Sequence, residues 1–170
     1  PALPHGADGS GFGYVVALTV TDRAEGFRFV FASDVQGPVS PVATAYLIRE
    51  RPHLLYLAGP PSYLQREIGA TALEQGIANL LTIIEKTGCQ VIMDHHALRD
   101  LHHEERLARL WETGKVVSAA KHLGVPEQLL EARRNFLWAQ KRRGGSVEKP
   151  ERLGYSGRDL NRERGKNPDG

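Results

Sequence analysis

A short apolar segment that ends in an acid and two histidines most limits how this chain can fold. Residues 89–93 are mostly apolar and follow Gly88, which predicts a short buried strand. Asp94, His95 and His96 come directly after it. Open α/β sheets place their chemistry just outside strand ends, and imidazole with carboxylate is the usual ligand set for zinc. The segment therefore indicates either a metal site or a polar loop with one histidine bonded to the backbone.

Three other segments have the composition of strands. Residues 14–20 and 27–32 are rich in β-branched and aromatic side chains, and the turn at residues 22–26 between them predicts an antiparallel hairpin. Residues 54–58 are continuously apolar, which favours a buried strand. The chain therefore combines strands with the helices described next, as α/β proteins do.

Apolar residues spaced three and four apart predict helices over residues 41–51 and 70–86. Weaker patterns predict further helices over residues 99–113, 118–123 and 126–140.

Composition separates a folded part from a basic tail. The 170 residues carry a net charge of +2, and the length fits one domain or part of a larger protein. Residues 141–170 hold nine Lys or Arg against five Asp or Glu and almost no apolar side chains. They predict a disordered basic tail after a domain over residues 1–140. Neither a disulfide nor a membrane span is expected, since Cys89 is the only cysteine and no apolar run approaches ~20 residues. We expect a cytoplasmic protein.

Polar side chains at other strand ends resemble the ligands of a hydrolytic metal site. His5 precedes the first strand in a glycine-rich loop, and Asp34 ends the second strand, where a plain aspartate turn is the alternative interpretation. Two-metal hydrolases use neutral imidazoles and a bridging carboxylate to hold ions that activate water. With His95 and His96, these residues provide the right types for half of such a site and are too few for all of it.

The order of these segments resembles the second half of the metallo-β-lactamase fold. More closely, the chain resembles an uncharacterised, largely archaeal family of hydrolases with that fold, over residues 1–138. The stretches that carry the resemblance are His5-Gly6, Gly13-Tyr14-Val15-Val16, Phe29-Val30-Phe31-Ala32-Ser33-Asp34, Ala58-Gly59-Pro60-Pro61-Ser62-Tyr63-Leu64, Asp94-His95-His96-Ala97-Leu98-Arg99-Asp100, Ala119-Ala120-Lys121-His122-Leu123-Gly124 and Leu130-Glu131-Ala132-Arg133.

The resemblance implies an αββα sandwich that binds two divalent ions, most simply zinc, at one edge of two facing sheets. It assigns His5 and His95 as metal ligands and Asp34 as the bridging, catalytic carboxylate. His96 is either a ligand or a neighbour of one, and Asp94 would orient an imidazole.

Two other residues near the expected site have two interpretations each. Arg99 either forms an ion pair with Asp100 or faces an anionic substrate. The Tyr63 hydroxyl either reaches the mouth of the site or packs beside it.

The fold's signature element, H-x-H-x-D-H, is absent from the sequence. The resemblance therefore implies half a hydrolase, whose N-terminal half belongs to the same or a separate chain. His53 also departs from the family pattern, because an aspartate is expected there. His102 and His103 are interpreted as residues of a solvated helix face and His122 as a surface or partly buried helix residue, none of them a metal ligand. Cys89 is interpreted as a buried strand residue.

The leading hypothesis is a metal-dependent hydrolase acting on a small molecule or a phosphodiester, alone or as a homo-oligomer. The alternative is a non-catalytic scaffold or binding subunit that retains the fold, with or without an association with RNA. A third hypothesis, an RNA-processing nuclease, is supported only by the charge of the tail.

Overall fold

A five-stranded mixed sheet forms the centre of the fold. The computed structural model describes residues 1–144. In the order β3-β4-β5-β6-β7, only β3 and β4 are antiparallel, and the other neighbours are parallel. The strands are β3 (Leu18–Thr21), β4 (Arg28–Phe31), β5 (Leu54–Leu57), β6 (Gln90–Met93) and β7 (Val116–Ser118). The hairpin predicted from the sequence is confirmed as β3 and β4.

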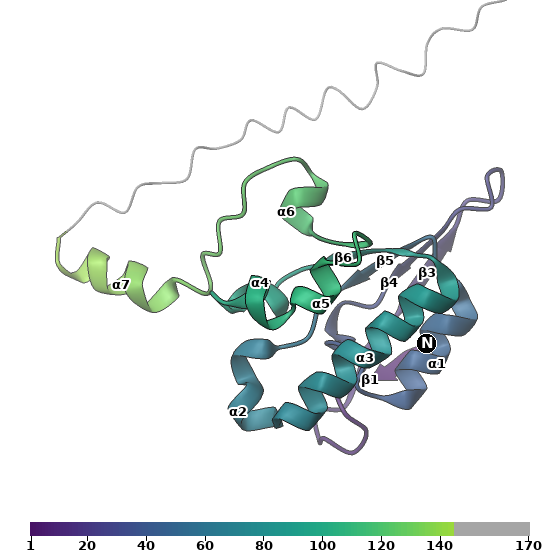
Figure 1. The fold of residues 1–170 in the computed structure, drawn as a ribbon, viewed down its shortest axis with the longest axis horizontal. Coiled ribbons are helices and arrows are strands. Elements are labelled where there is room, and N and C mark those ends of the chain that lie inside the picture. Colours follow the sequence, from purple (N-terminus) through teal and green to yellow (C-terminus); the bar gives the residue numbers. More distant parts are fainter. Residues whose placement is uncertain (145–170) are drawn as a thin grey trace, which may run out of the picture. The chain divides into compact units, whose positions relative to one another are not determined.

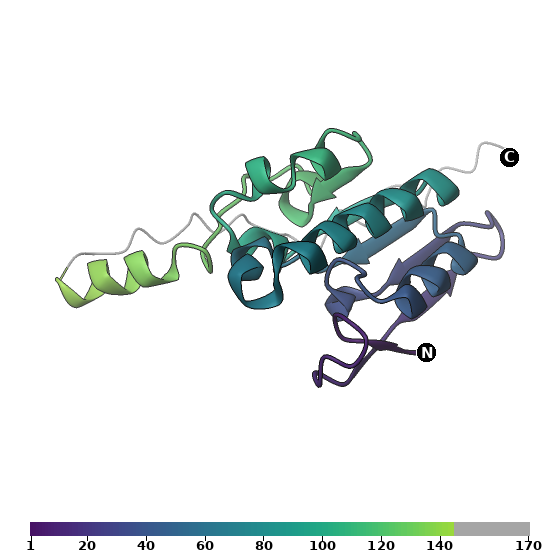
Figure 2. The same cartoon turned by 60° about the horizontal axis from the view of Figure 1, so that its bottom comes forward.

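One face of the sheet is buried beneath two helices, α1 (Pro41–Glu50) and α3 (Ala70–Thr87), which contact each other (Figures 1 and 2). Capping residues set the start of α1 and the end of α3. The Ser40 side chain accepts hydrogen bonds from the first turn of α1, and α3 ends at left-handed Gly88. The fully buried side chains of this layer include Val30, Leu47, Leu55, Leu57, Ile77, Leu80, Val91 and Met93.

The opposite face of the sheet stays largely open over β3, β4 and β5. The register places Leu18 beside Phe31 and Phe31 beside Tyr56, so these side chains point to the same side. Leu18 is 55% exposed and Val20 is 50% exposed. We call this surface the open face; its residues are Leu18, Val20, Phe29, Phe31, Leu54 and Tyr56.

A separate two-stranded antiparallel sheet, β1 (Ala2–Pro4) with β2 (Tyr14–Val16), contacts α1. The strand predicted over residues 14–20 is therefore divided at Ala17, whose N–H donates to the Pro1 carbonyl. The remaining elements are short: η1 (Ser33–Val35), η2 (Ser62–Leu64), α2 (Gln65–Ile68), η3 (Ala97–Arg99), α4 (His103–Arg106), α5 (Ala108–Trp111), α6 (Ala119–His122) and α7 (Arg134–Arg142).

The prediction of one helix over residues 99–113 is wrong. The buried Asp100 carboxylate accepts a hydrogen bond from the His102 N–H and others from Ser62 and Arg106. An aspartate that bonds the backbone two residues ahead competes with helix formation. The segment forms η3, α4 and α5 instead, and β7 follows where no strand was predicted.

The helix predicted over residues 126–140 starts late. It begins only at Arg134, after Leu129 adopts a left-handed backbone with φ of 43°. The compact units are residues Pro1–Arg134 and Asn135–Gly170. Of the tail predicted over residues 141–170, Lys141 and Arg142 end α7, and residues 145–170 lie outside the described part.

The described residues form a mixed α/β fold with a five-stranded sheet flanked by helices. The second large sheet of the expected sandwich is not among residues 1–144. No helix within this range is long and apolar enough to cross a membrane.

Two glycines with the same φ of +86° separate the effects of backbone strain and close packing. A Cβ on Gly59 would lie 2.7 Å from the Ala97 Cβ, whereas a Cβ on Gly69 would meet nothing within 4 Å. Gly69→Ala should cost about 1–3 kcal/mol from backbone strain alone. Gly59→Ala should lower the free energy of unfolding by at least about 1 kcal/mol more, because the clash adds to the strain. Urea unfolding measures both losses, and equal losses would show that Gly59 is not tightly packed.

Candidate metal centre

Three loops meet at the carboxyl edge of the parallel strands. Asp34 lies in η1 directly after β4, and the Asp94-His95-His96 segment follows β6. The third loop follows β5 and lies between them. The backbone of its Ala58 forms hydrogen bonds to both of the other loops. The Ala58 N–H donates to the Ser33 carbonyl at 2.6 Å, and the Ala58 carbonyl accepts from the N–H groups of His96 and Ala97, both at 2.9 Å. Parallel pairing therefore holds segments distant in sequence at one place.

Asp34, His95 and His96 converge there. Asp34 Oδ1 lies 3.2 Å from His95 Nε2 and 4.0 Å from His96 Nε2. One atom from each residue falls within 4.8 Å of the others. Ligands about 2.1 Å from a zinc ion lie at most ~4.2 Å apart. The two distances from Asp34 are thus compatible with a shared ion.

His5 lies beside this cluster without being part of it. Its ring is stacked parallel to that of His96, with 6.5 Å between centroids and 6° between planes. The His5 backbone is held by its N–H, which donates to the Gly13 carbonyl at 3.0 Å. The structure thus places His5 near the predicted ligands, though it is not one of the three whose ligand atoms converge.

Two buried imidazole nitrogens in this region have no hydrogen-bond partner, His5 Nε2 and His96 Nδ1. Buried polar atoms are almost always paired, so each exception calls for an explanation such as a bound ion or water. Imidazoles with a carboxylate suit zinc and similar divalent ions. The donor set therefore fits a metal at this place, and the unpaired His5 Nε2 is available to join it. The unpaired nitrogen of His96 is Nδ1, whereas its Nε2 faces Asp34.

Burial shifts the protonation of His96. Its side chain is 12% exposed, and desolvation, followed by the charges of His95 and Arg99, lowers its pKa to about 4. The imidazole is therefore neutral at pH 7, which is the form that binds metals.

Tyr56 is a site residue that sequence reasoning missed. It lies near the end of β5 on the open face, and its hydroxyl donates a short hydrogen bond to Asp94 Oδ2. Burial is the main cause of the raised pKa of this hydroxyl, with Asp94 adding to it. Asp94 Oδ2 lies 3.9 Å from His95 Nδ1, so Asp94 is next to the imidazole without a direct hydrogen bond. The sequence signal that could have identified Tyr56 is its hydroxyl, the only polar group among the side chains of the apolar strand Leu54–Leu57.

Arg99, Tyr63 and His53 form hydrogen bonds outside the cluster of Asp34, His95 and His96. Arg99 Nη1 donates to the Tyr63 hydroxyl at 3.2 Å, which joins the loops after β5 and β6. His53 is structural, because its Nδ1 accepts from the Arg28 N–H at 3.0 Å and its ring stacks on Phe27.

The remaining histidines lie outside the cluster. His102 and His122 are exposed as expected. His103 is 2% exposed and packs against Trp111, so the expectation of a solvated position is wrong. Cys89 is buried, as predicted.

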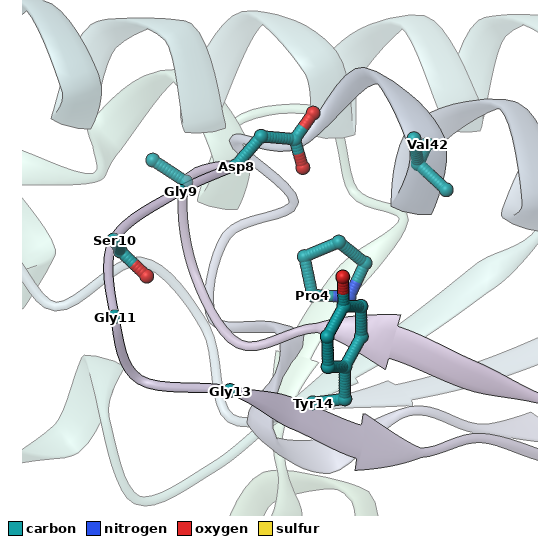
Figure 3. Close-up of a pocket in the computed structure, with 9 residues that line it drawn as sticks. Pro4, Asp8, Gly9, Ser10, Gly11, Gly13, Tyr14 and Val42 are labelled. Carbon is teal, nitrogen blue, oxygen red and sulfur yellow. The ribbon is translucent and has the colours of Figure 1, made fainter.

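Cavities differ in their relation to the cluster. A cavity of about 230 Å³ adjoins His95 and is lined further by Leu98, Ala120 and residues 127–131. A larger one, about 410 Å³, lies at the glycine-rich loop between β1 and β2 (Figure 3). Its lining includes Asp8, Ser10 and Tyr14 but none of the three converging residues. Of these two cavities, the one beside His95 is therefore the one that adjoins the cluster.

Known relatives are uncharacterised archaeal proteins. The chain is 42% identical to a UPF0282 protein of Methanopyrus kandleri over 137 residues, which cover 79% of this chain and 46% of that protein. It is 39% identical to a UPF0282 protein of Thermococcus gammatolerans over 154 residues, which cover 91% and 49%. It is also 39% identical to one of Methanocaldococcus jannaschii over 134 residues, which cover 79% and 43%. The chain thus spans about half the length of the curated relatives it matches.

These similarities support the expected link to an uncharacterised, largely archaeal family, and the relatives' names state no activity. No family model matches the chain. No solved structure matches it either.

The lowered pKa of His96 predicts a pH dependence in the metal-free protein. Between pH 6.5 and about 4, the unfolded state binds a proton at this residue that the folded state does not. The free energy of unfolding should therefore fall as the pH decreases through this window, by up to about 3 kcal/mol from this group. An NMR titration of the imidazole should find its midpoint near pH 4. His96→Asn should lose this part of the pH dependence, and a midpoint near 6.5 would contradict the assignment.

Proposed function

We propose that this chain forms half of a divalent-metal-dependent hydrolase with the metallo-β-lactamase fold, acting through a dinuclear centre. The observation that carries the proposal is the convergence of Asp34, His95 and His96 at one strand edge, beside unpaired buried nitrogens of His5 and His96. Zinc is the ion that this donor set suits best.

The residues of this chain have separate tasks in the proposed site. His95 and His96 would hold an ion through neutral imidazoles, and His5 would add a further nitrogen. Asp34 is the one acid of the cluster, and its side chain is 42% exposed, so it can offer its oxygens to two ions. Asp94, held by Tyr56, would keep the His95 ring in place. When bound, the metals would supply an activated water near neutral pH and polarise the bond to be broken.

The rest of the site must come from elsewhere. Two zinc ions need about four ligands each, and the described cluster with His5 offers four residues in total. The relatives extend over about twice the matched length. We infer that the remaining half, in the same or another chain, contributes the H-x-H-x-D-H ligands.

The open face supports a sandwich with that second half. Exposed side chains such as Leu18, Val20 and Phe31 form a contiguous apolar surface across three strands. A cavity of about 380 Å³ continues it toward Ile92 and Val117. Apolar surfaces of this kind mark interaction sites, and a second sheet packed face to face would cover them. Tyr56 connects this face to the metal cluster through Asp94.

Asp34→Ala should reduce bound zinc at least ~10-fold, because it removes the shared carboxylate and leaves only imidazoles. Elemental analysis after equilibrium dialysis measures the stoichiometry, and circular dichroism checks the fold. Asp8→Ala, which removes an exposed carboxylate from the glycine-rich loop, is the matched control and should bind as much zinc as the unaltered chain. Unchanged stoichiometry in Asp34→Ala would overturn the proposal, and a chain that binds no zinc would favour the scaffold hypothesis.

Co-expression tests the proposed second half. The part of the Methanopyrus kandleri relative outside the matched region should co-purify with this chain and raise bound zinc toward two ions per complex. Phe31→Asp places a charge on the open face and should abolish the association, whereas Leu101→Asp, at another exposed apolar position, should not. If both variants still associate with the second half, docking does not take place on this face.

A further inference from the structure

Arg99 is placed on the same side of its turn as His96. It ends η3, a 3₁₀ turn that starts directly after His96. Side chains three residues apart eclipse each other in a 3₁₀ turn, so Arg99 projects alongside the imidazole. The charge of Arg99 accordingly contributes to the lowered pKa of His96.

The guanidinium of Arg99 lacks a carboxylate partner. Among residues 1–144, no acidic oxygen is found within ion-pair distance of it, so the expected pair with Asp100 is not formed. Asp100 pairs instead with Arg106 at 2.9 Å. Arg109 similarly pairs with Glu74 at 2.9 Å. Arg106 and Arg109 thus have carboxylate partners that Arg99 lacks.

The hydrogen bonds of Arg99 leave part of its fork free. Nη1 donates to the Tyr63 hydroxyl at 3.2 Å, while Nε is buried without a partner. The bond to Tyr63 orients the side chain, and it is the main cause of the raised pKa of Arg99. An oriented guanidinium with an unused buried N–H is suited to a planar or tetrahedral oxyanion, which it can bind through two parallel hydrogen bonds.

The charge around the cluster favours an anion as well. The three converging residues include a single carboxylate, Asp34. Divalent ions bound there would leave the site strongly positive, and Arg99 adds to that charge. Asp34 and Glu131 act on Arg99 only from beyond ion-pair distance, so an oxyanion in direct contact would balance its charge more fully than a neutral ester.

We propose that Arg99, positioned by Tyr63, binds an oxyanion of the substrate, so that the hydrolase acts on molecules with a phosphate or carboxylate group next to the bond that is cleaved. The substrate class rests on the proposed hydrolase function. The anion site itself does not, because it is formed by residues of this chain without a metal. In the hydrolysis, water forms the new bond to phosphorus or carbon, the ester bond breaks, and the leaving oxygen takes one proton from the water.

NMR titration of the metal-free, ¹⁵N-labelled chain tests the anion site directly. Inorganic phosphate and acetate are added in separate titrations, and the Arg99 Nε–H signal is followed. At least one of the two anions should shift this signal with saturation, and the tighter one identifies the oxyanion class. Arg99→Gln should weaken that binding by at least ~10-fold, because it removes a charge-assisted hydrogen-bond donor. Arg109→Gln, which removes an exposed arginine paired with Glu74, should leave the affinity unchanged.

Two further variants separate this inference from the proposed function. Tyr63→Phe should weaken anion binding less than Arg99→Gln, since it removes only the positioning hydroxyl. Asp34→Ala should keep anion binding while losing zinc, so a failure of the metal proposal leaves the anion site testable. Equal affinities in the unaltered chain and Arg99→Gln, or no shift with either anion, would overturn the inference.

Discussion

The candidate centre depends on the backbone hydrogen bonds of Ala58. Its N–H bonds the loop after β4, and its carbonyl bonds the loop after β6. The strands β4 and β6 lie on either side of β5 in the sheet. Asp34 and His95 are 61 positions apart in sequence, and this connection is what brings them to 3.2 Å. The close approach of Gly59 to Ala97, where a Cβ on Gly59 would lie 2.7 Å from the Ala97 Cβ, also brings the loops after β5 and β6 together.

The site also carries an energetic cost, because two buried imidazole nitrogens have no hydrogen-bond partner among the described residues. Burying an imidazole nitrogen without a partner is unfavourable by about 1–3 kcal/mol, and both His5 and His96 do so. The fold tolerates this because the neighbouring sheet and helices form a large apolar core. Unpaired buried groups cluster at functional sites, which is why they support the proposed metal. The exposed apolar side chains of the open face support the proposed second sheet in the same way.

Much of the architecture could be predicted from the sequence, because it follows from local periodicity. The strands β4, β5 and β6 and the helices α1 and α3 have clear apolar patterns, and their bounds agree within two residues. Strand ends at Asp34 and His95 could be recognised for the same reason. That these residues bind a metal stays a prediction.

Other features depend on contacts between distant residues and leave little trace in the sequence. Asp100 interrupts a helix because it meets Ser62 from the loop after β5 and Arg106 six residues ahead. Tyr56 reaches Asp94 only once β5 and β6 pair in their observed register. The freedom of Arg99 from Asp100 is a consequence of that same network, since Asp100 is already engaged by Arg106.

The claim that imidazoles of the β6 edge share a metal with Asp34 is tested most directly by zinc X-ray absorption on the zinc-loaded chain. The account predicts a first shell of nitrogen and oxygen at about 2.0–2.1 Å. It also predicts outer-shell imidazole scattering that weakens when His95 and His96 are both replaced by alanine, leaving at most the contribution of His5. A first shell without imidazole scattering, or one with sulfur at about 2.3 Å from Cys89, would contradict it.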